Sequence, residues 1–198
     1  MSLPNHFLGY FVQTLNAEIG QDTLRMLLNK AGMDAELSDP QPLFHLETDS
    51  ATRAYLDIQA ALRLHYGRGT RGLLIRVGRL LWPLLSAKSD PLLKIRWRAI
   101  QLLPASIRVQ PALKLLASLL RGKTQNQITI HNLDLDWMLV DHDFSGTLPG
   151  SSGQPVCFVT QGLIQECVYW AGKHELDVTE VTCKANGADA CEFRIKAG

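Results

Sequence analysis

The sequence lacks the long apolar run that a membrane-spanning helix needs. No stretch of its 198 residues reaches the roughly 18 uninterrupted apolar residues that cross a bilayer. The first residues also lack the charged and then apolar layout of a secretion signal. The hydrophobic fraction of 46% is nevertheless ordinary for a globular protein. We therefore expect a cytoplasmic protein with a sizeable core.

Cysteine is scarce, and its spacing matches no common metal motif. The four cysteines include no CxxC pair, and the six histidines form no HxxxH or HExxH pair. Two disulfides would need an oxidising compartment. In a cytoplasmic chain of this size, a bound metal or free reduced thiols are the better interpretation.

Motifs for nucleotides and for nucleophilic catalysis are missing as well. Glycines at 67, 69 and 72, with Arg68 and Arg71, could cradle a phosphate through close backbone approach. Their spacing fits neither a Walker loop nor a dinucleotide fingerprint, so a tight turn between two helices is the favoured interpretation. No GxSxG elbow is present. We predict no catalytic residue and no nucleic-acid partner, and the sequence leaves open whether the protein is an enzyme.

Acidic residues are nearly absent from one long segment. Residues 68–123 hold twelve of the twenty basic residues but a single acid. Two interpretations of this imbalance are equally favoured. One is a surface for an anionic partner, and the other is a solvated helical face whose charge is balanced by the acidic rest of the chain. A peripheral membrane contact is possible because Arg76, Arg79, Arg96 and Arg98 accompany leucine and tryptophan. Core packing of these apolar residues is the favoured alternative.

Apolar periodicity predicts an α+β protein. Spacings of three and four predict helices over 5–19, 22–32 and 50–66, and three apolar and basic helices within 73–121. Alternation over Gln125–Asp141 predicts strands, and a helix over 156–172 should precede two closing strands. Residues 33–49 and 143–153 are expected to be loops.

This element order predicts a helical N-terminal half packed with a small antiparallel sheet. We expect one domain over residues 1–198, comprising a helical part (1–123) and a strand, helix and hairpin part (124–198).

Three thiols and a carboxylate near the C-terminus form a chemically sensible set for zinc: Cys157, Glu180, Cys183 and Cys191. Cys183 and Cys191 flank an Asn-Gly turn and could therefore lie side by side in a hairpin. On an ideal strand, however, Glu180 and Cys183 point to opposite faces, so one ion can bind both only if the strand bulges or ends between them. The alternative is three buried reduced thiols with an exposed glutamate.

The run from Cys157 to Phe193 resembles the 4-vinyl reductase domain family. It has an early Cys, a glycine-bearing helix, an acid three residues before a second Cys, a glycine turn and a final Cys-x-Phe. Upstream, Tyr66-Gly-Arg-Gly-Thr-Arg-Gly72 and Val77-Gly78-Arg79 resemble the glycine-rich middle of the same family. The family is similar in fold to subunits of the TRAPP vesicle-tethering complexes. The resemblance implies a zinc ion on Cys157, Glu180, Cys183 and Cys191, and four protein ligands make such a site structural.

The resemblance also implies a hydrophobic cavity between helices and sheet, suited to a small apolar or aromatic ligand. Trp137 and Trp170 are candidate ligand contacts because they lie in the family's ligand-bearing half, and His131 is a further candidate to line a cavity. Ordinary core and surface roles are the alternative for all three. The protein would then be a carrier, sensor or accessory factor.

Two other functions stay open. One is a role in tetrapyrrole (bacteriochlorophyll or chlorophyll) biosynthesis, although no nucleotide or flavin motif is present to supply hydride. The other is a protein–protein adaptor, by analogy of fold. Because members of the resembled family pair, we also expect a homodimer through the N-terminal helices.

Overall fold

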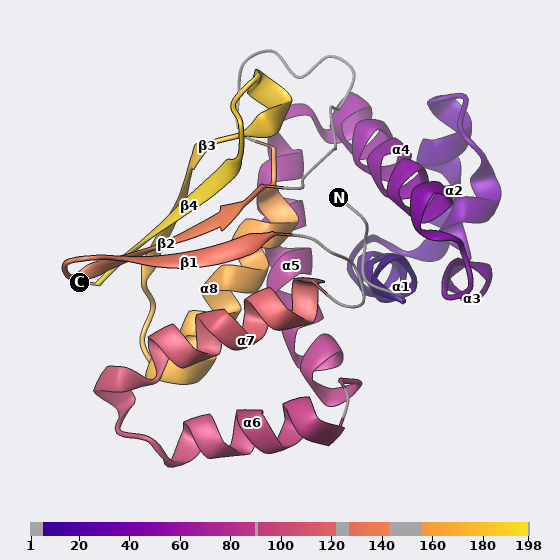
Figure 1. The fold of residues 1–198 in the computed structure, drawn as a ribbon. Coiled ribbons are helices and arrows are strands. Elements are labelled where there is room, and N and C mark those ends of the chain that lie inside the picture. Colours follow the sequence, from indigo (N-terminus) through magenta and orange to yellow (C-terminus); the bar gives the residue numbers. More distant parts are fainter. Residues whose placement is uncertain (1–5, 90, 122–126, 143–155, 198) are drawn as a thin grey trace.

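The computed structural model describes residues 6–89, 91–121, 127–142 and 156–197. It confirms the α+β class, with a helical N-terminal half and a small antiparallel sheet (Figure 1). The helices and strands in chain order are α1 (Phe7–Ile19), α2 (Gln21–Lys30), α3 (Pro40–Leu43), α4 (Thr48–Tyr66), α5 (Thr70–Ala87), α6 (Pro91–Leu102), α7 (Val109–Arg121), β1 (Ile128–Leu133), β2 (Asp136–Asp141), α8 (Phe158–Gly172), β3 (Asp177–Thr182) and β4 (Cys191–Lys196).

The N-terminal helices form a group on one side of the molecule, with α5 between them and the sheet (Figure 1). Aromatic side chains join α1 to α4 at their contact. The rings of Phe7 and Phe11 meet the ring of Tyr55 edge to face, with centroids 5.8 and 4.9 Å apart. All three side chains are buried. This aromatic contact, with the leucines around it, holds the N-terminal group together.

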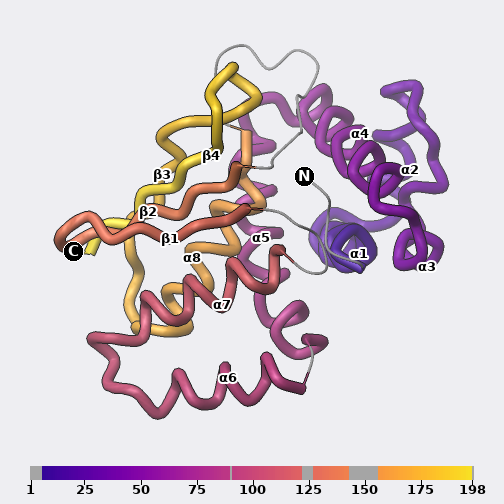
Figure 2. The backbone as a smooth tube through the Cα atoms, in the orientation of Figure 1, coloured from indigo at the N-terminus to yellow at the C-terminus, as the bar shows by residue number. Residues whose placement is uncertain are grey.

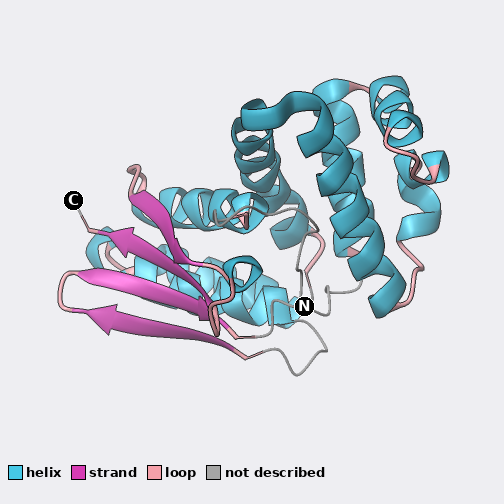
Figure 3. Ribbon diagram, turned by 90° about the horizontal axis from the view of Figure 1, so that it is seen from above, coloured by secondary structure: helices cyan, strands magenta, loops and turns pink. Residues whose placement is uncertain are grey.

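The four strands pair antiparallel throughout, in the order β1-β2-β4-β3. Helix α8 connects β2 to β3 in the chain, and the helices cover one face of the sheet (Figure 3). Strand residues alternate accordingly: Leu139, Val178 and Phe193 are buried against the helices, whereas Thr179 and Arg194 are exposed. The period-two pattern therefore reflects a sheet with one covered face.

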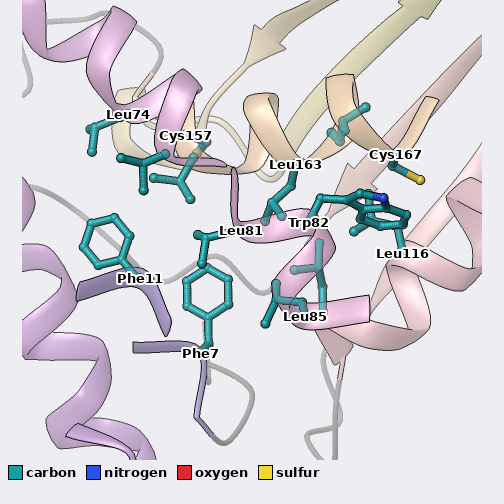
Figure 4. Packing of buried hydrophobic residues seen from close by; sticks show 14 of the residues in the cluster. Phe7, Phe11, Leu74, Leu81, Trp82, Leu85, Leu116, Cys157, Leu163 and Cys167 are labelled. Atoms are coloured by element: carbon teal, nitrogen blue, oxygen red, sulfur yellow. The ribbon is translucent and has the colours of Figure 1, made fainter. Parts of the chain in front are cut away.

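Helices α5 and α8 cross so closely that their backbones touch. A Cβ atom on Gly78 would collide with the carbonyl oxygen of Val159, and one on Gly162 would collide with the carbonyl oxygen of Ile75. Each glycine thus makes room for the other helix. Leu81 of α5 and Leu163 of α8 extend this contact into the core (Figure 4).

A helical hairpin of α6 and α7 forms the edge of the molecule away from α4 (Figures 1 and 2). Trp97 fixes α6 to the rest of the fold, because its ring lies 4.6 Å from that of Trp82 on α5 and 5.2 Å from that of Trp170 on α8. Among the described residues, no helix has the length and apolar character to cross a membrane.

The expected loop over 33–49 is wrong in part, because it contains two short helices. A 3-10 helix spans Ala35–Ser38 and α3 follows. The side chains of Asp34 and Asp39 each accept a hydrogen bond from the backbone two residues on, and thereby cap these helices. The expected loop over 143–153 lies outside the described residues.

The crossing generates a paired prediction for glycine-to-alanine changes in α5. Gly78→Ala should lower the free energy of unfolding by at least about 2 kcal/mol, because the added methyl group overpacks a backbone contact. Gly72→Ala, in the same helix with open space around its Cβ position, should instead raise it by about 0.5–1 kcal/mol through helix propensity. Chemical denaturation of both variants measures the difference. Equal effects at the two positions would contradict the close crossing.

Candidate functional site

Four residues from three segments meet at the end of the sheet nearest the start of α8. Cys157 is the residue just before α8, Glu180 lies on β3, Cys183 follows β3, and Cys191 begins β4. The pairing of β3 with β4 shifts register between Glu180 and Thr182, and β3 ends at Thr182. This irregularity turns Glu180 and Cys183 to the same side, as a common site for both requires.

The sulfur atoms have the spacing of a tetrahedral zinc site. Cys157 Sγ lies 3.8 Å from Cys183 Sγ and 3.5 Å from Cys191 Sγ, and the last two lie 3.9 Å apart. All four ligand atoms, including a Glu180 oxygen, lie within 4.8 Å of one another. Zinc–sulfur bonds of about 2.3 Å in tetrahedral geometry place the sulfurs about 3.8 Å apart. The cysteines are free and buried, so the set fits one zinc ion.

Glu180 contributes a buried carboxylate with one oxygen unsatisfied. Its Oε2 accepts a hydrogen bond from the backbone N–H of Cys157 at 3.0 Å. Its Oε1 is buried without a hydrogen-bond partner among the described residues. Burial and the neighbouring Cys183 side chain raise the pKa of Glu180 to about 8. A cation would relieve this costly arrangement, because it supplies the missing partner and favours the ionised carboxylate.

Hydrogen bonds link the three sulfur atoms, and Cys183 accepts the last of them. The Cys157 thiol donates to Cys191 Sγ, and the Cys191 thiol donates to Cys183 Sγ. Hydrogen bonding with Cys157, and then with Cys191, holds the pKa of Cys183 well below its ordinary value. Hydrogen bonding with Cys183 and Cys191, followed by burial, raises the pKa of Cys157. The hydrogen bond from Cys157 lowers the pKa of Cys191, but the bond to Cys183 and burial outweigh it, so that this pKa also rises. Among the three thiols, Cys183 is therefore the one most readily ionised.

Arg63 on α4 brings a positive charge to this centre from the helical half of the chain. Burial lowers the pKa of its guanidinium, while Cys157, Cys183 and Glu180, in their ionised forms, oppose that shift. One terminal nitrogen, Nη2, is buried with no hydrogen-bond partner among the described residues. Zinc with three thiolates and a carboxylate carries about two negative charges. Arg63 is placed to offset part of that charge.

Sequence reasoning missed Arg63. It lies four residues after Gln59 and eight after Tyr55, both of which are buried on α4. The available signal was therefore a charged residue on a buried helical stripe. Nothing local connects that stripe with cysteines that lie about 90 to 130 residues later in the sequence.

The three predicted ligand contacts lie in different surroundings. Trp137 is half-buried on β2, on the same sheet face as Leu139. Trp170 packs with Trp82 and Trp97, whose ring centroids lie 6.0 and 5.2 Å away. His131 is exposed on β1 and hydrogen-bonds Thr129 Oγ1 at 2.8 Å. In the described part of the chain, no ring contact joins any of these three residues to another.

A groove of about 470 Å³ lies where α5 and α8 meet the surface. Apolar side chains of α5, including Ile75 and Leu80, form part of it. Charge lines the rest, since Arg79 pairs with Glu166 at 2.9 Å and with Glu175 at 2.8 Å. The groove includes part of the 73–121 helices, as expected for a ligand cavity, but neither Trp137 nor Trp170 lines it.

Zinc binding to the reduced, metal-free protein should release about three protons at pH 7, from Cys157, Cys191 and Glu180. Because the pKa of Glu180 lies near 8 rather than at 4.5, this carboxyl holds its proton between those pH values. Zinc must displace that proton, so zinc affinity should rise with pH across the window. Glu180→Gln should release about one proton fewer. Calorimetric titration in buffers of different ionisation enthalpy counts the protons, and equal release from the two proteins would refute a protonated Glu180.

Arg63→Gln should lower zinc affinity by about tenfold, the usual scale for loss of an outer-sphere partner. Arg53→Gln is the matched control, because Arg53 is exposed on the same helix. Competition with a chromophoric chelator measures both affinities. If Arg63→Gln binds zinc as tightly as Arg53→Gln, the charge of Arg63 does not act on the centre.

The chain shares its fold with solved structures of low sequence identity. The phenol-responsive sensory domain of the transcription activator PoxR, solved with phenol, aligns with a TM-score of 0.55 at 15% identity over 73% of each chain. An H-NOX protein from S. oneidensis in the Fe(II)NO state aligns with a TM-score of 0.55 at 16% identity, over 95% of this chain and 97% of that one. The NMR structure of a Shewanella oneidensis H-NOX domain in the Fe(II)CO state gives 0.54 at 15% identity, over 99% and 98%. At these identities the likeness establishes the fold.

The family comparison concerns the C-terminal part of the chain. No curated protein matches the sequence. The model of the 4-vinyl reductase domain matches residues 143–197, the stretch that contains Cys157, Glu180, Cys183 and Cys191. The match confirms the resemblance to the 4-vinyl reductase domain family over residues 143–197. The upstream resemblance over residues 66–79 and the similarity to TRAPP subunits stay predictions.

Proposed function

We propose that this chain is a small-molecule-binding domain of the sensor or carrier type, held together by one structural zinc ion. The observation that carries the proposal is the cluster of three thiols and a carboxylate within 4.8 Å inside the segment that matches the 4-vinyl reductase domain. Cys157, Glu180, Cys183 and Cys191 would hold the ion. Four protein ligands leave no open coordination position, so the zinc would cross-link rather than catalyse.

Such a cross-link would act on a hairpin that has little regular secondary structure at its tip. The segment after β3 contains a single 3-10 turn (Lys184–Asn186) before β4 begins. Through the ion, Cys157 would link this hairpin to the start of α8. Within the hairpin, the backbone N–H of Lys184 donates a hydrogen bond to Cys191 Sγ at 3.3 Å. Zinc would therefore fix the hairpin against the helix, and its binding free energy would add to folding.

The fold supports a small apolar or aromatic ligand. The PoxR sensory domain, which shares the fold, was solved with phenol. Among the three predicted contacts, Trp137 is the best placed, because it is half-buried on the helix-facing side of the sheet. Trp170 is already packed by two other tryptophans, and His131 faces solvent. We therefore centre the proposed ligand contact on Trp137.

A tetrapyrrole is the second candidate, and the donor atoms favour it less. The H-NOX neighbours were solved with liganded Fe(II). An iron tetrapyrrole needs an axial histidine, cysteine, methionine or tyrosine facing its pocket. All six histidines of this chain are exposed, and three of its four cysteines lie in the zinc cluster. No histidine of this chain is therefore buried where it could serve as the axial ligand of a haem.

The remaining parts of the proposal concern assembly and location. We retain the homodimer through the N-terminal helices, supported by the exposed Leu64 on α4 and Met26 on α2. Reduced, buried cysteines suit the proposed cytoplasmic location. A protein–protein adaptor becomes the better description if no small molecule binds.

An uncharged fluorescent probe, N-phenyl-1-naphthylamine, tests the ligand proposal. It should bind the zinc-loaded protein with a dissociation constant near or below about 1 µM, equivalent to about 8 kcal/mol. Trp137→Glu should weaken binding at least about tenfold, because it places a charge against an apolar ligand. Leu80→Glu, in the α5–α8 groove, serves as the control. Loss of binding in the Leu80 variant alone would move the site to the groove, and no binding to any protein would favour the adaptor.

A further inference from the structure

Helix α6 carries two apolar stripes, and one of them faces away from the protein. Leu92, Ile95 and Leu102 are 73%, 63% and 88% exposed, and Ala99 between them is exposed as well. Their spacing of three, four and three places them on a strip covering about a quarter of the helix circumference. Single exposed leucines are ordinary on protein surfaces, but an aligned row on one helix marks a contact surface.

The opposite face of α6 explains why the helix holds this row outward. Trp97 and Ile100 are 6% and 7% exposed and pack into the core, where Trp97 meets Trp82 and Trp170. The helix is therefore anchored and cannot rotate its outer stripe inward. It lies along the outer edge of the molecule, with α7 on its inner side (Figures 1 and 2).

Basic side chains border the exposed stripe on both sides. At about 100° per residue, Lys94 and Arg98 lie along one border and Arg96 along the other. All three are exposed, and none forms an ion pair with any residue that the structure describes. The described part of α6 contains no acidic residue. The outer face is thus an apolar strip framed by positive charges that no described residue pairs.

We infer that the outer face of α6 docks on an anionic lipid surface. An apolar strip enters the boundary between headgroups and acyl chains, while flanking lysine and arginine meet lipid phosphates and carboxylates. A second copy of the chain fits less well, because two such faces would bring like charges together. Nucleic acid would use the charges but would leave the exposed leucine and isoleucine without a partner.

This docking would leave the zinc centre and the ligand face free. The hairpin of α6 and α7 lies at one edge, while β3, β4 and the start of α8 meet elsewhere (Figure 1). A membrane-associated domain could therefore receive an apolar ligand directly from the bilayer. The docking itself does not depend on that ligand or on zinc chemistry, so its test is separate from those above.

Sedimentation of the full zinc-loaded chain with vesicles tests the inference. The protein should pellet with vesicles of about 70% phosphatidylcholine and 30% phosphatidylserine, and should stay in the supernatant with phosphatidylcholine alone. Neutralising Lys94, Arg96 and Arg98 to Gln should lower the partition coefficient at least about tenfold. The pair Ile95→Ser and Leu102→Ser should also lower it about tenfold, because apolar insertion is lost.

Matched controls lie away from α6. Leu135→Ser removes a comparably exposed leucine (78%) from the turn between β1 and β2, and Arg53→Gln removes an exposed charge from α4. Neither should change vesicle binding. The inference fails if the chain ignores anionic vesicles, or if it binds neutral vesicles equally well. It also fails if the Ile95 and Leu102 pair instead converts a dimer to a monomer in light scattering, since α6 would then be a face for a second copy.

Discussion

The rest of this structure depends on the place where α5 and α8 touch backbone to backbone. Gly78 and Gly162 each face a carbonyl oxygen of the other helix, so neither position tolerates a side chain. The crossing joins the helical half of the chain to the half that contains the sheet. It also fixes the start of α8, and therefore the position of Cys157, relative to the N-terminal helices. Because close-packed helices have little freedom to shift, this crossing limits how far Cys157 can move relative to the other residues of the site.

The proposed zinc centre uses that fixed point. The close packing of α8 against α5 fixes the position of Cys157. The register shift in β3 then places Glu180 and Cys183 beside it. Arg63 on α4 interacts electrostatically with Cys157, Cys183 and Glu180. The helices, the sheet and the closing hairpin thus each contribute a ligand or a charged side chain to the centre. Preorganised ligands and a compensating charge are the features by which proteins hold a metal tightly.

Much of this arrangement could be predicted from the sequence, and the misses have physical reasons. Apolar periodicity indicated the main helices and strands, and the pattern from Cys157 to Phe193 indicated the cluster. The helices over 33–49 were missed because aspartate caps, rather than apolar spacing, start them. Arg63 was missed because its partners are remote in sequence. The tryptophan cluster of Trp82, Trp97 and Trp170 was also invisible, since side-chain contacts between α5, α6 and α8 arise only from tertiary packing.

X-ray absorption at the zinc edge measures the ligands of the proposed centre directly. Protein purified without chelator should contain zinc, with three sulfur atoms at about 2.3 Å and one oxygen at about 2.0 Å from the metal. Glu180→Gln should retain the three sulfurs and change the lighter ligand. A shell of nitrogen and oxygen atoms without sulfur, or the absence of zinc from a folded protein, would show that the cysteine cluster is not a structural zinc site.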